Sequence, residues 1–270
     1  MLPIRDRNPS GQVPAVSWAL IAVNILVFMA YFPLGSERSV IEVYQTWGLV
    51  PARLSAGEGA STLVTAMFIH GGWLHLGLNM LFLRVFGDNI EDAMGHWRYP
   101  LFFVLCGMAG AGTEAWLTHD PYLPVIGASG AIAGVMGAYL LLHPRAKVLV
   151  LVAFRVPVLV PAGVFVGLSV VLDLISALSD IPGEVRVAFW VHVGGFAMGA
   201  ALIPLLRKRD VPLFQPPVPH PEAGFLGAGR WLPDFARERP GGSALAFWLK
   251  AVLFFVLISI LVETFLAGGS

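Results

Sequence analysis

The chain has 270 residues, of which 57% are hydrophobic and only 13% are charged, and its mean hydropathy is +0.75. A water-soluble domain of this composition would expose far too much apolar surface, so we expect a polytopic membrane protein. The 17 basic residues balance the 17 acidic ones, and this zero net charge gives no electrostatic support for a nucleic-acid partner. Cys106 is the only cysteine, which excludes an internal disulfide.

Apolar segments long enough to cross a membrane follow one another along most of the chain. The seven expected spans are residues 18–32, 73–86, 99–117, 129–143, 158–178, 187–206 and 244–266. They predict an all-α fold, a polytopic membrane helix bundle with a six-helix core at 17–206 and a seventh transmembrane helix at 244–266. Residues 1–16 are expected to form a cytoplasmic N-terminal segment, and the Pro- and Gly-rich residues 207–243 a cytoplasmic linker.

The stretches between these spans give weaker predictions. Residues 36–60 are rich in Gly, Ser and Glu, and Tyr44 and Trp47 suit a loop that lies on the bilayer surface. The apolar run at 148–179 is longer than one crossing, so its start is expected to be an interfacial excursion. An acidic turn is expected between the second and third spans, at Asp88, Glu91 and Asp92.

Basic residues indicate how the chain is oriented in the membrane. They concentrate on alternate connections, at Arg5, Arg7, Arg98, Arg145, Lys147, Arg207, Lys208, Arg209, Arg230, Arg237 and Arg239. By the positive-inside rule, the N-terminus is expected in the cytoplasm and the C-terminus outside. The second, fourth and sixth spans then enter the membrane from the extracytoplasmic side.

Four polar side chains lie near the starts of these three spans. Ser129 begins the fourth span within Gly127-Ala128-Ser129-Gly130, His192 lies near the start of the sixth, and His75 and Asn79 share one face of the second. Polar groups in hydrocarbon are tolerated mainly where they face the bundle interior or a water-filled cavity. We therefore expect the four to converge in the outer half of the membrane.

The expected cluster suits acyl transfer. A serine hydroxyl needs an adjacent base to become a nucleophile, and the neutral imidazole of His192 can serve Ser129 in this way. Since Gly127 lacks a Cβ, backbone N–H groups can approach closely, and the Ser129 N–H with the side chains of His75 and Asn79 could stabilise an oxyanion. An aspartate in mid-membrane costs about 2.5–3.5 kcal/mol, so a dyad is expected, with Asp173 left open as a third, orienting member.

Structural interpretations of the same residues stay open at this point. A serine in an apolar helix commonly bonds to its own backbone, and an asparagine such as Asn79 commonly joins two helices. The GxxxG steps Gly130/Gly134 and Gly195/Gly199 indicate close packing of the fourth and sixth spans. Such packing would bring Ser129 within reach of His192.

A metal site is the rival chemical interpretation of the histidines. His70, His75 and His192 could supply imidazole ligands. The sequence lacks a His-Glu-x-x-His motif, and no cysteine or carboxylate completes the set of ligands. No metal and no cofactor are therefore expected.

Three motifs together resemble those of the rhomboid intramembrane serine proteases. They are Gly127-Ala128-Ser129-Gly130, His70-x4-His75-x3-Asn79 and Val191-His192-Val193-Gly194-Gly195-Phe196. They occur in the order of that family, and the resemblance covers the six-span core from about residue 17 to 206. This combination is far more specific than the GxSG motif alone, which soluble hydrolases also carry.

The resemblance implies a serine endopeptidase in an integral cell membrane. It implies Ser129 as the nucleophile, His192 as the general base, His75 and Asn79 as oxyanion donors, and His70 at the border of the site. The implied partners are membrane lipids and transmembrane protein substrates, which would be cleaved near their outer ends. Some members carry an aromatic residue one turn after the serine, where this chain has Ala133.

Two other functions compete with proteolysis. A non-catalytic relative of the family could use the same fold to bind client transmembrane helices, although Ser129, His192, His75 and Asn79 are all intact. A transporter could use His192 and Asp173 as a proton relay, although the chain lacks paired half-spans related by a repeat.

Overall fold

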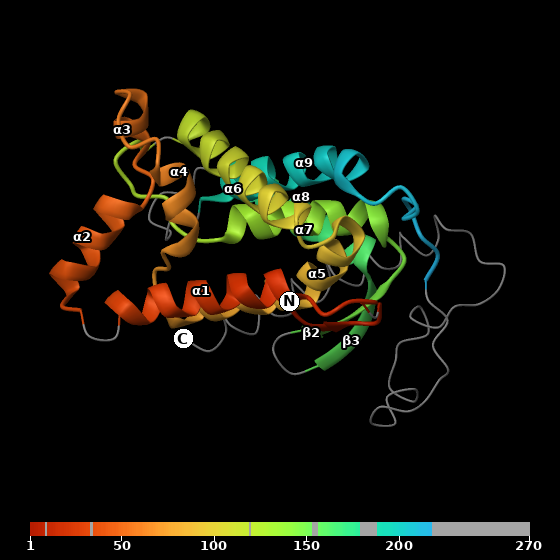
Figure 1. Ribbon diagram of the computed structural model, residues 1–270. Coiled ribbons are helices and arrows are strands. Elements are labelled where there is room, and N and C mark those ends of the chain that lie inside the picture. The colour runs from red at the N-terminus through yellow and green to blue at the C-terminus, as the bar shows by residue number, and fades with distance from the viewer. Residues whose placement is uncertain (9, 33–34, 119, 153–155, 179–187, 218–270) are drawn as a thin grey trace.

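The computed structural model describes the chain apart from residues 9, 33–34, 119, 153–155, 179–187 and 218–270. The expected seventh helix and most of the expected linker lie outside the described residues. Six longer apolar helices lie where the first six spans were expected: α1 (Ala15–Tyr31), α5 (Trp73–Met94), α6 (Arg98–Leu117), α7 (Ser129–Leu142), α8 (Ala162–Leu178) and α9 (Phe189–Leu206). The described part of the chain is therefore mostly helical, as predicted (Figure 1).

Two of the described helices, α6 and α9, are long and apolar enough to cross a membrane unaided. A third span results if Thr62–Phe68 and α5, which meet at a bend of 97°, are counted together, and α1, α7 and α8 are shorter apolar helices. Large apolar side chains stand exposed on the outside of the bundle, for example Trp116 at 83% and Leu205 at 77%. These helices fit membrane spans, while the six-plus-one number of crossings stays a prediction.

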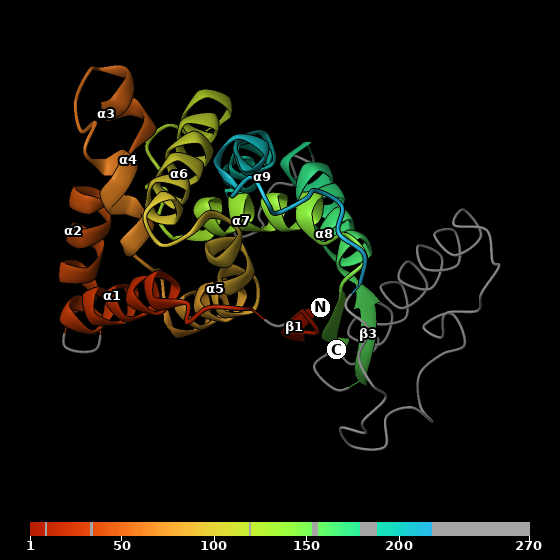
Figure 2. The same ribbon diagram turned by 45° about the vertical axis from the view of Figure 1, so that its right-hand side comes forward.

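Helix α7 is the centre of the bundle, and α5, α6, α8 and α9 surround it (Figures 1 and 2). Every residue from Gly130 to Tyr139 is buried. An apolar helix buried on all sides needs no amphipathic pattern, and α7 has none. The N-terminal end of α7 lies towards α4, whereas the chain leaves α7 towards the three strands (Figure 1).

Glycines let α7 and α9 touch backbone to backbone. A Cβ added to Gly195 would collide with the carbonyl oxygen of Gly130, and one added to Gly199 would collide with that of Gly134. These contacts advance together along both helices, so α7 and α9 run parallel. The close packing predicted from the two GxxxG steps is confirmed.

A three-stranded antiparallel sheet corrects the all-α prediction. Its strands β1 (Leu2–Asp6), β2 (Lys147–Val152) and β3 (Val156–Pro161) lie in that order, with Leu2 opposite Leu151 and Val148 opposite Val160. The start of the run at 148–179 was expected to be an interfacial excursion, and residues 158–178 a span. Instead, residues 147–152 form β2, in which the β-branched Val148, Val150 and Val152 are buried and alternate with partly buried residues. The expected N-terminal segment supplies β1, which pairs with β2. No local pattern in the sequence indicates this pairing.

The segment at 36–60 is largely helical, which corrects the predicted loop. It contains α2 (Glu37–Trp47) and α3 (Pro51–Ser55), followed by α4 (Thr62–Thr65) and the 3-10 helix η1 (Ala66–Phe68). The Ser36 side chain accepts the Ser39 N–H at the start of α2, which is a typical N-cap. The Gly- and Ser-rich composition hid this short amphipathic helix.

The predicted acidic turn is also wrong, because α5 continues through it to Met94. Glu91 is buried there, and its carboxylate accepts the N–H groups of Val16 and Ser17 at 2.9 and 2.8 Å. These are unpaired N–H groups in the first turn of α1, so a carboxylate from α5 satisfies the start of another helix. The helix ends at Gly95, whose φ of +83° suits glycine.

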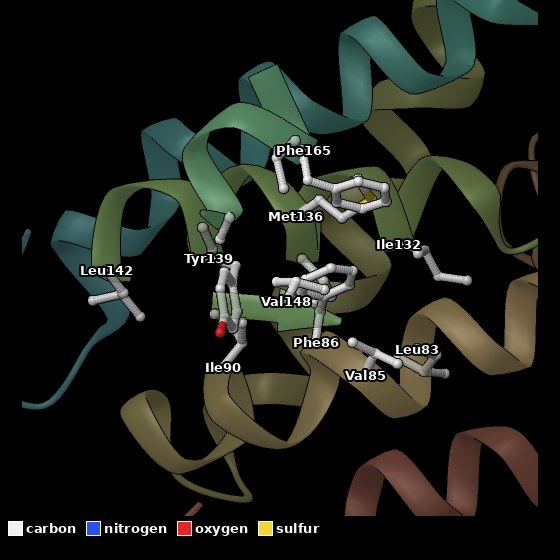
Figure 3. Close-up of a cluster of buried hydrophobic side chains, with 14 of the residues drawn as sticks. Leu83, Val85, Phe86, Ile90, Ile132, Met136, Tyr139, Leu142, Val148 and Phe165 are labelled. Carbon is white, nitrogen blue, oxygen red and sulfur yellow. The ribbon is translucent and has the colours of Figure 1, made fainter. Parts of the chain in front are cut away.

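The largest hydrophobic cluster joins α5, α7, α8 and the sheet, and Figure 3 shows part of it. The Phe86 ring lies edge-on to Tyr139, with centroids 5.0 Å apart, and stacks on Phe165 at 6.1 Å. The described start of the expected linker packs beside this cluster, because Phe214 N–H donates to the Leu141 carbonyl. The cluster follows α7 along its length, and the rings of Phe86 and Phe165 lie near Tyr139, ten residues after Ser129.

Candidate active site

The chain turns sharply into α7 at Gly127. Its φ of +116° is disfavoured for residues with a Cβ, and its N–H donates to the Ala66 carbonyl of η1 at 2.9 Å. Ala128 is buried, and Ser129, the first helical residue, is partly buried. The Ser129 hydroxyl therefore lies at the N-terminal end of a buried helix, on a backbone anchored to η1.

The start of α9 lies against the same end of α7. A Cβ on Gly130 would approach the Val191 Cγ1 to 2.6 Å and the Val191 carbonyl oxygen to 3.4 Å. Gly110 of α6 adjoins both, since a Cβ there would lie 3.3 Å from the Gly130 Cα. Ser129 and His192 are the chain neighbours of Gly130 and Val191, so the structure brings their positions together on adjoining turns of parallel helices.

His75 lies against Gly127. A Cβ on Gly127 would be 2.7 Å from the His75 Nε2, while the His75 Nδ1 accepts the Gly71 N–H at 3.2 Å. Because Nδ1 accepts, the neutral ring carries its hydrogen on Nε2. A donor N–H thus lies next to the Gly127 turn that leads into Ser129. The rings of His75 and His192 also interact electrostatically.

Asn79 lies one turn after His75 on α5. Its side chain is buried, and its Nδ2 donates to the His75 carbonyl at 2.8 Å. This hydrogen bond lies within one helix, which differs from the interhelical bond considered above. An amide nitrogen has two hydrogens, so this bond leaves one of them for another acceptor.

His70 lies behind His75 as a fully buried neighbour. The two rings meet edge to face with centroids 5.1 Å apart, and neither ring nitrogen of His70 has a hydrogen-bond partner in the structure. The Tyr31 hydroxyl holds the His70 backbone from both sides, since it accepts the N–H and donates to the carbonyl, each at 2.7 Å. Sequence reasoning missed Tyr31, because nothing local links the end of α1 to a residue 39 positions later.

Asp173 of α8 contacts His192. The Asp173 Oδ2 lies 3.2 Å from the His192 Nδ1, and the two side chains are 27% and 24% exposed. Asp173 was left open as a residue that orients His192, and the structure places the two side chains in contact. A second carboxylate nearby, that of Glu114, is buried on α6 beside the backbone N–H groups of Trp190 and Val191.

Within the described part of the chain, no group of three or more His, Cys, Asp or Glu side chains could hold a metal ion. That the protein works without a metal or cofactor stays a prediction.

Much of the chain is similar in sequence to known proteins. Residues 58–209, more than half of the chain, match the rhomboid domain. Rhomboid-like protein 11, chloroplastic, of Arabidopsis thaliana is 27% identical over 215 residues, which cover 75% of this chain and 69% of that protein. Rhomboid protein 1, mitochondrial, of Saccharomyces cerevisiae is 34% identical over 146 residues, which cover 52% of this chain and 40% of the relative.

A bacterial relative carries an activity in its name. Rhomboid protease GluP of Bacillus subtilis is 28% identical over 189 residues, which cover 70% of this chain and 35% of that protein. The chain thus spans less than half the length of the yeast and bacterial relatives. The rhomboid match includes α5 to α9 and with them His75, Asn79, Ser129 and His192. The resemblance drawn from three motifs is confirmed, and this chain belongs to the rhomboid family.

Proposed function

We propose that the protein is an intramembrane serine endopeptidase in which Ser129 is the nucleophile and His192 the general base. The observation that carries this proposal is the backbone contact between the parallel helices α7 and α9. It holds Gly130 against Val191, and the hydroxyl and the imidazole belong to the residues next to these two along the chain, Ser129 and His192. The protease named among the relatives supports the same function.

The reaction would proceed by acyl transfer. As the Ser129 Oγ attacks a substrate peptide carbonyl, its proton passes to the His192 Nε2. The tetrahedral intermediate collapses when the imidazolium donates that proton to the leaving amine, which leaves an acyl-enzyme. Water, deprotonated by the same imidazole, attacks the ester and releases the second product. Because both side chains are only partly buried, water can reach them.

Three donors could stabilise the oxyanion of the tetrahedral intermediate. The Ser129 N–H is one of the first four N–H groups of α7, which have no partner within the helix. The His75 Nε2–H lies beside Gly127, and Asn79 retains one amide hydrogen. The positive end of the α7 dipole acts in the same direction. Gly127 contributes by its lack of a side chain, which would occupy the space of the His75 ring. His70 would border the site by packing against that ring.

We further propose transmembrane protein segments as the substrates and membrane lipids as the surrounding partners. Basic residues at alternate connections favour a cytoplasmic N-terminus and an active site towards the extracytoplasmic side. Cleavage would then occur near the outer end of a substrate helix. Small, helix-destabilising residues are expected there, because a helical backbone hides its carbonyls from attack. The six-helix core at 17–206, the linker at 207–243 and the seventh helix at 244–266 belong to this proposal.

Labelling with a fluorophosphonate probe tests the proposal without knowledge of the substrate. The full chain in detergent should react at Ser129, and Ser129→Ala should remove the label. Ser169→Ala is the matched control, because Ser169 on α8 merely donates to the Phe165 carbonyl of its own helix at 2.9 Å. Labelling that is absent from the folded wild-type protein would favour a non-catalytic protein that binds client transmembrane helices.

A further inference from the structure

The contact between Asp173 and His192 joins two helices at the proposed site. The Asp173 Oδ2 is 3.2 Å from the His192 Nδ1, an ion-pair contact at the upper end of the range of N–H···O hydrogen bonds. Asp173 is the only acidic residue of α8, and Val171, Leu172, Leu174 and Ile175 around it are apolar. A carboxylate in such a helix is costly unless it has a partner. His192 supplies that partner.

The chemistry of the two groups decides which of them donates the hydrogen in this contact. A carboxylate can only accept, so the His192 Nδ1 must carry a hydrogen to bond with it. The hydrogen bond at one ring nitrogen fixes the state of the other, which leaves the His192 Nε2 with a lone pair in the neutral ring. That nitrogen is then the acceptor that a serine base requires. His75 shows the reverse arrangement, since its Nδ1 accepts the Gly71 N–H.

The other charged or titratable groups near His192 do not offer this contact. His75 of α5 interacts with it electrostatically and lies against Gly127. Glu114 of α6 lies beside the N–H groups of Trp190 and Val191 at the start of α9. Ala133, one turn after Ser129, has no ring that could stack on the imidazole. Among the described residues, the ion-pair contact on the His192 ring comes from Asp173.

We propose that Asp173 is a positioning residue that holds His192 in the Nδ1–H tautomer and stabilises the imidazolium formed during catalysis. The inference rests on the proposed protease function and extends the Ser129/His192 dyad to a triad. It also makes the base depend on α8, because a displacement of α8 would withdraw the carboxylate from α9.

Three substitutions separate the parts of this role. Asp173→Leu removes the acceptor and the charge. Asp173→Asn removes the charge and adds an NH2 group that can donate to the His192 Nδ1 and favour the other tautomer. Asp173→Glu keeps the acceptor and the charge on a longer side chain. We expect kcat to fall by about 10²-fold to 10⁴-fold in the first two, with KM little changed and a partial rescue in the third. Asp120→Asn, in the loop before α7, removes the same charge from a side chain that accepts the Tyr122 N–H, and should leave kcat unchanged.

A second measurement excludes a merely structural role. Leucine suits a membrane helix better than aspartate, so Asp173→Leu should unfold at an equal or higher temperature in detergent while its kcat falls. Loss of kcat in parallel with loss of folded protein in all three variants would overturn the proposal. Unchanged kcat in folded Asp173→Leu would overturn it as well.

The tautomer itself can be read by 15N NMR of histidine-labelled protein, with the His192 signals assigned by their absence from His192→Asn. The wild-type ring should show a protonated Nδ1 and an unprotonated Nε2 when neutral, and Asp173→Leu should lose this preference. An identical tautomer in both proteins would contradict the inference. Since this signal needs no substrate, wild-type protein that fails to label at Ser129 would refute the proposed function while the tautomer still decides the role of Asp173.

Discussion

The two ends of α7 are equally buried but are built in different ways. At the Ser129 end, glycines hold α7 against α6 and α9 by backbone contact, and polar side chains gather around the helix start. At the Tyr139 end, large rings fill the space between α5, α8 and the sheet (Figure 3). Small residues bring main chains and reactive groups close together, whereas large residues supply dispersion contacts. One helix thus carries the proposed chemistry at its start and its largest packed rings near its end.

The Tyr139 end also has its own polar network. The Tyr139 hydroxyl donates to the Asp6 Oδ2 at 2.7 Å, and the Asn89 Nδ2 donates to the same oxygen at 2.9 Å. Burial raises the pKa of Asp6 from its ordinary 3.8 to about 7, although the hydrogen bond from Tyr139 acts in the opposite direction. These bonds attach β1 to α7 and α5. The groups at this end attach the sheet to the helices, and those at the other end form the candidate site.

The largest expected effect is the loss of proteolysis in Ser129→Ala. Cleavage of a reporter transmembrane segment should fall by at least about 10⁴-fold, because the nucleophile is removed. The temperature of unfolding should stay the same, since the hydroxyl takes no part in the packing of α7. A large loss of stability would show that the Ser129 hydroxyl also supports the packing of α7. Unchanged turnover would refute the protease proposal.

Phe86→Ala tests the opposite end. Phe86 is fully buried against Tyr139 and Phe165, so the substitution should lower the free energy of unfolding by about 3–5 kcal/mol. Leu101→Ala, at a position on α6 that is 55% exposed, is the control and should have a small effect. Denaturation in detergent measures both. The protein that remains folded should keep its fluorophosphonate labelling, and a folded Phe86→Ala protein that no longer labels would show that this packing also supports the candidate site.

Asn79→Ala sharpens the comparison within the Ser129 end. If the free amide hydrogen stabilises the oxyanion, kcat should fall by about 10²-fold to 10³-fold. Asn24→Ala is a closely matched control, because Asn24 is also buried and donates to the carbonyl four residues earlier in its own helix, at 2.8 Å. Equal effects of the two substitutions on kcat would assign Asn79 a structural role.

The smallest effect is expected from Asp6→Asn, and it depends on pH. The pKa of Asp6 is raised in the folded state, so its contribution to stability is fully present below 3.8 and is lost as the pH rises towards about 7. Asparagine keeps an acceptor for Tyr139 and carries no charge. The variant should therefore unfold at a higher temperature than wild type at about pH 8 and at nearly the same temperature at about pH 4. A difference that is the same at both pH values would contradict the raised pKa.

Much of the helical core could be predicted because membrane helices have a strong local signal. Residues 99–117 and 129–143 were expected as helices and correspond to α6 and α7 within one residue at each end. The strands at 147–161 were missed because a short run of Val and Leu suits a strand and an apolar helix equally well. The helix at 37–47 was missed because its cap and its amphipathic face lie in a polar, Gly-rich context.

The sequence predicted which residues belong to the candidate site, but not which contacts they make. The spacing of His75 and Asn79 on one helix face follows from the helical repeat. That the Asn79 amide bonds to the His75 carbonyl, or that Tyr31 holds the backbone of His70, depends on side-chain conformation and on distant segments. Such contacts have no local pattern in the sequence.

Composition and local motifs were enough to establish a helical membrane protein of the rhomboid family, because hydrocarbon as a solvent restricts the chain to a few structures. They also named Ser129 and His192, since glycines around a serine and a histidine near GxxxG steps are local features. The three-dimensional arrangement alone decided the pairing of Asp173 with His192 and of β1 with β2. Each of these joins residues far apart in the chain, and their approach depends on how the whole bundle packs.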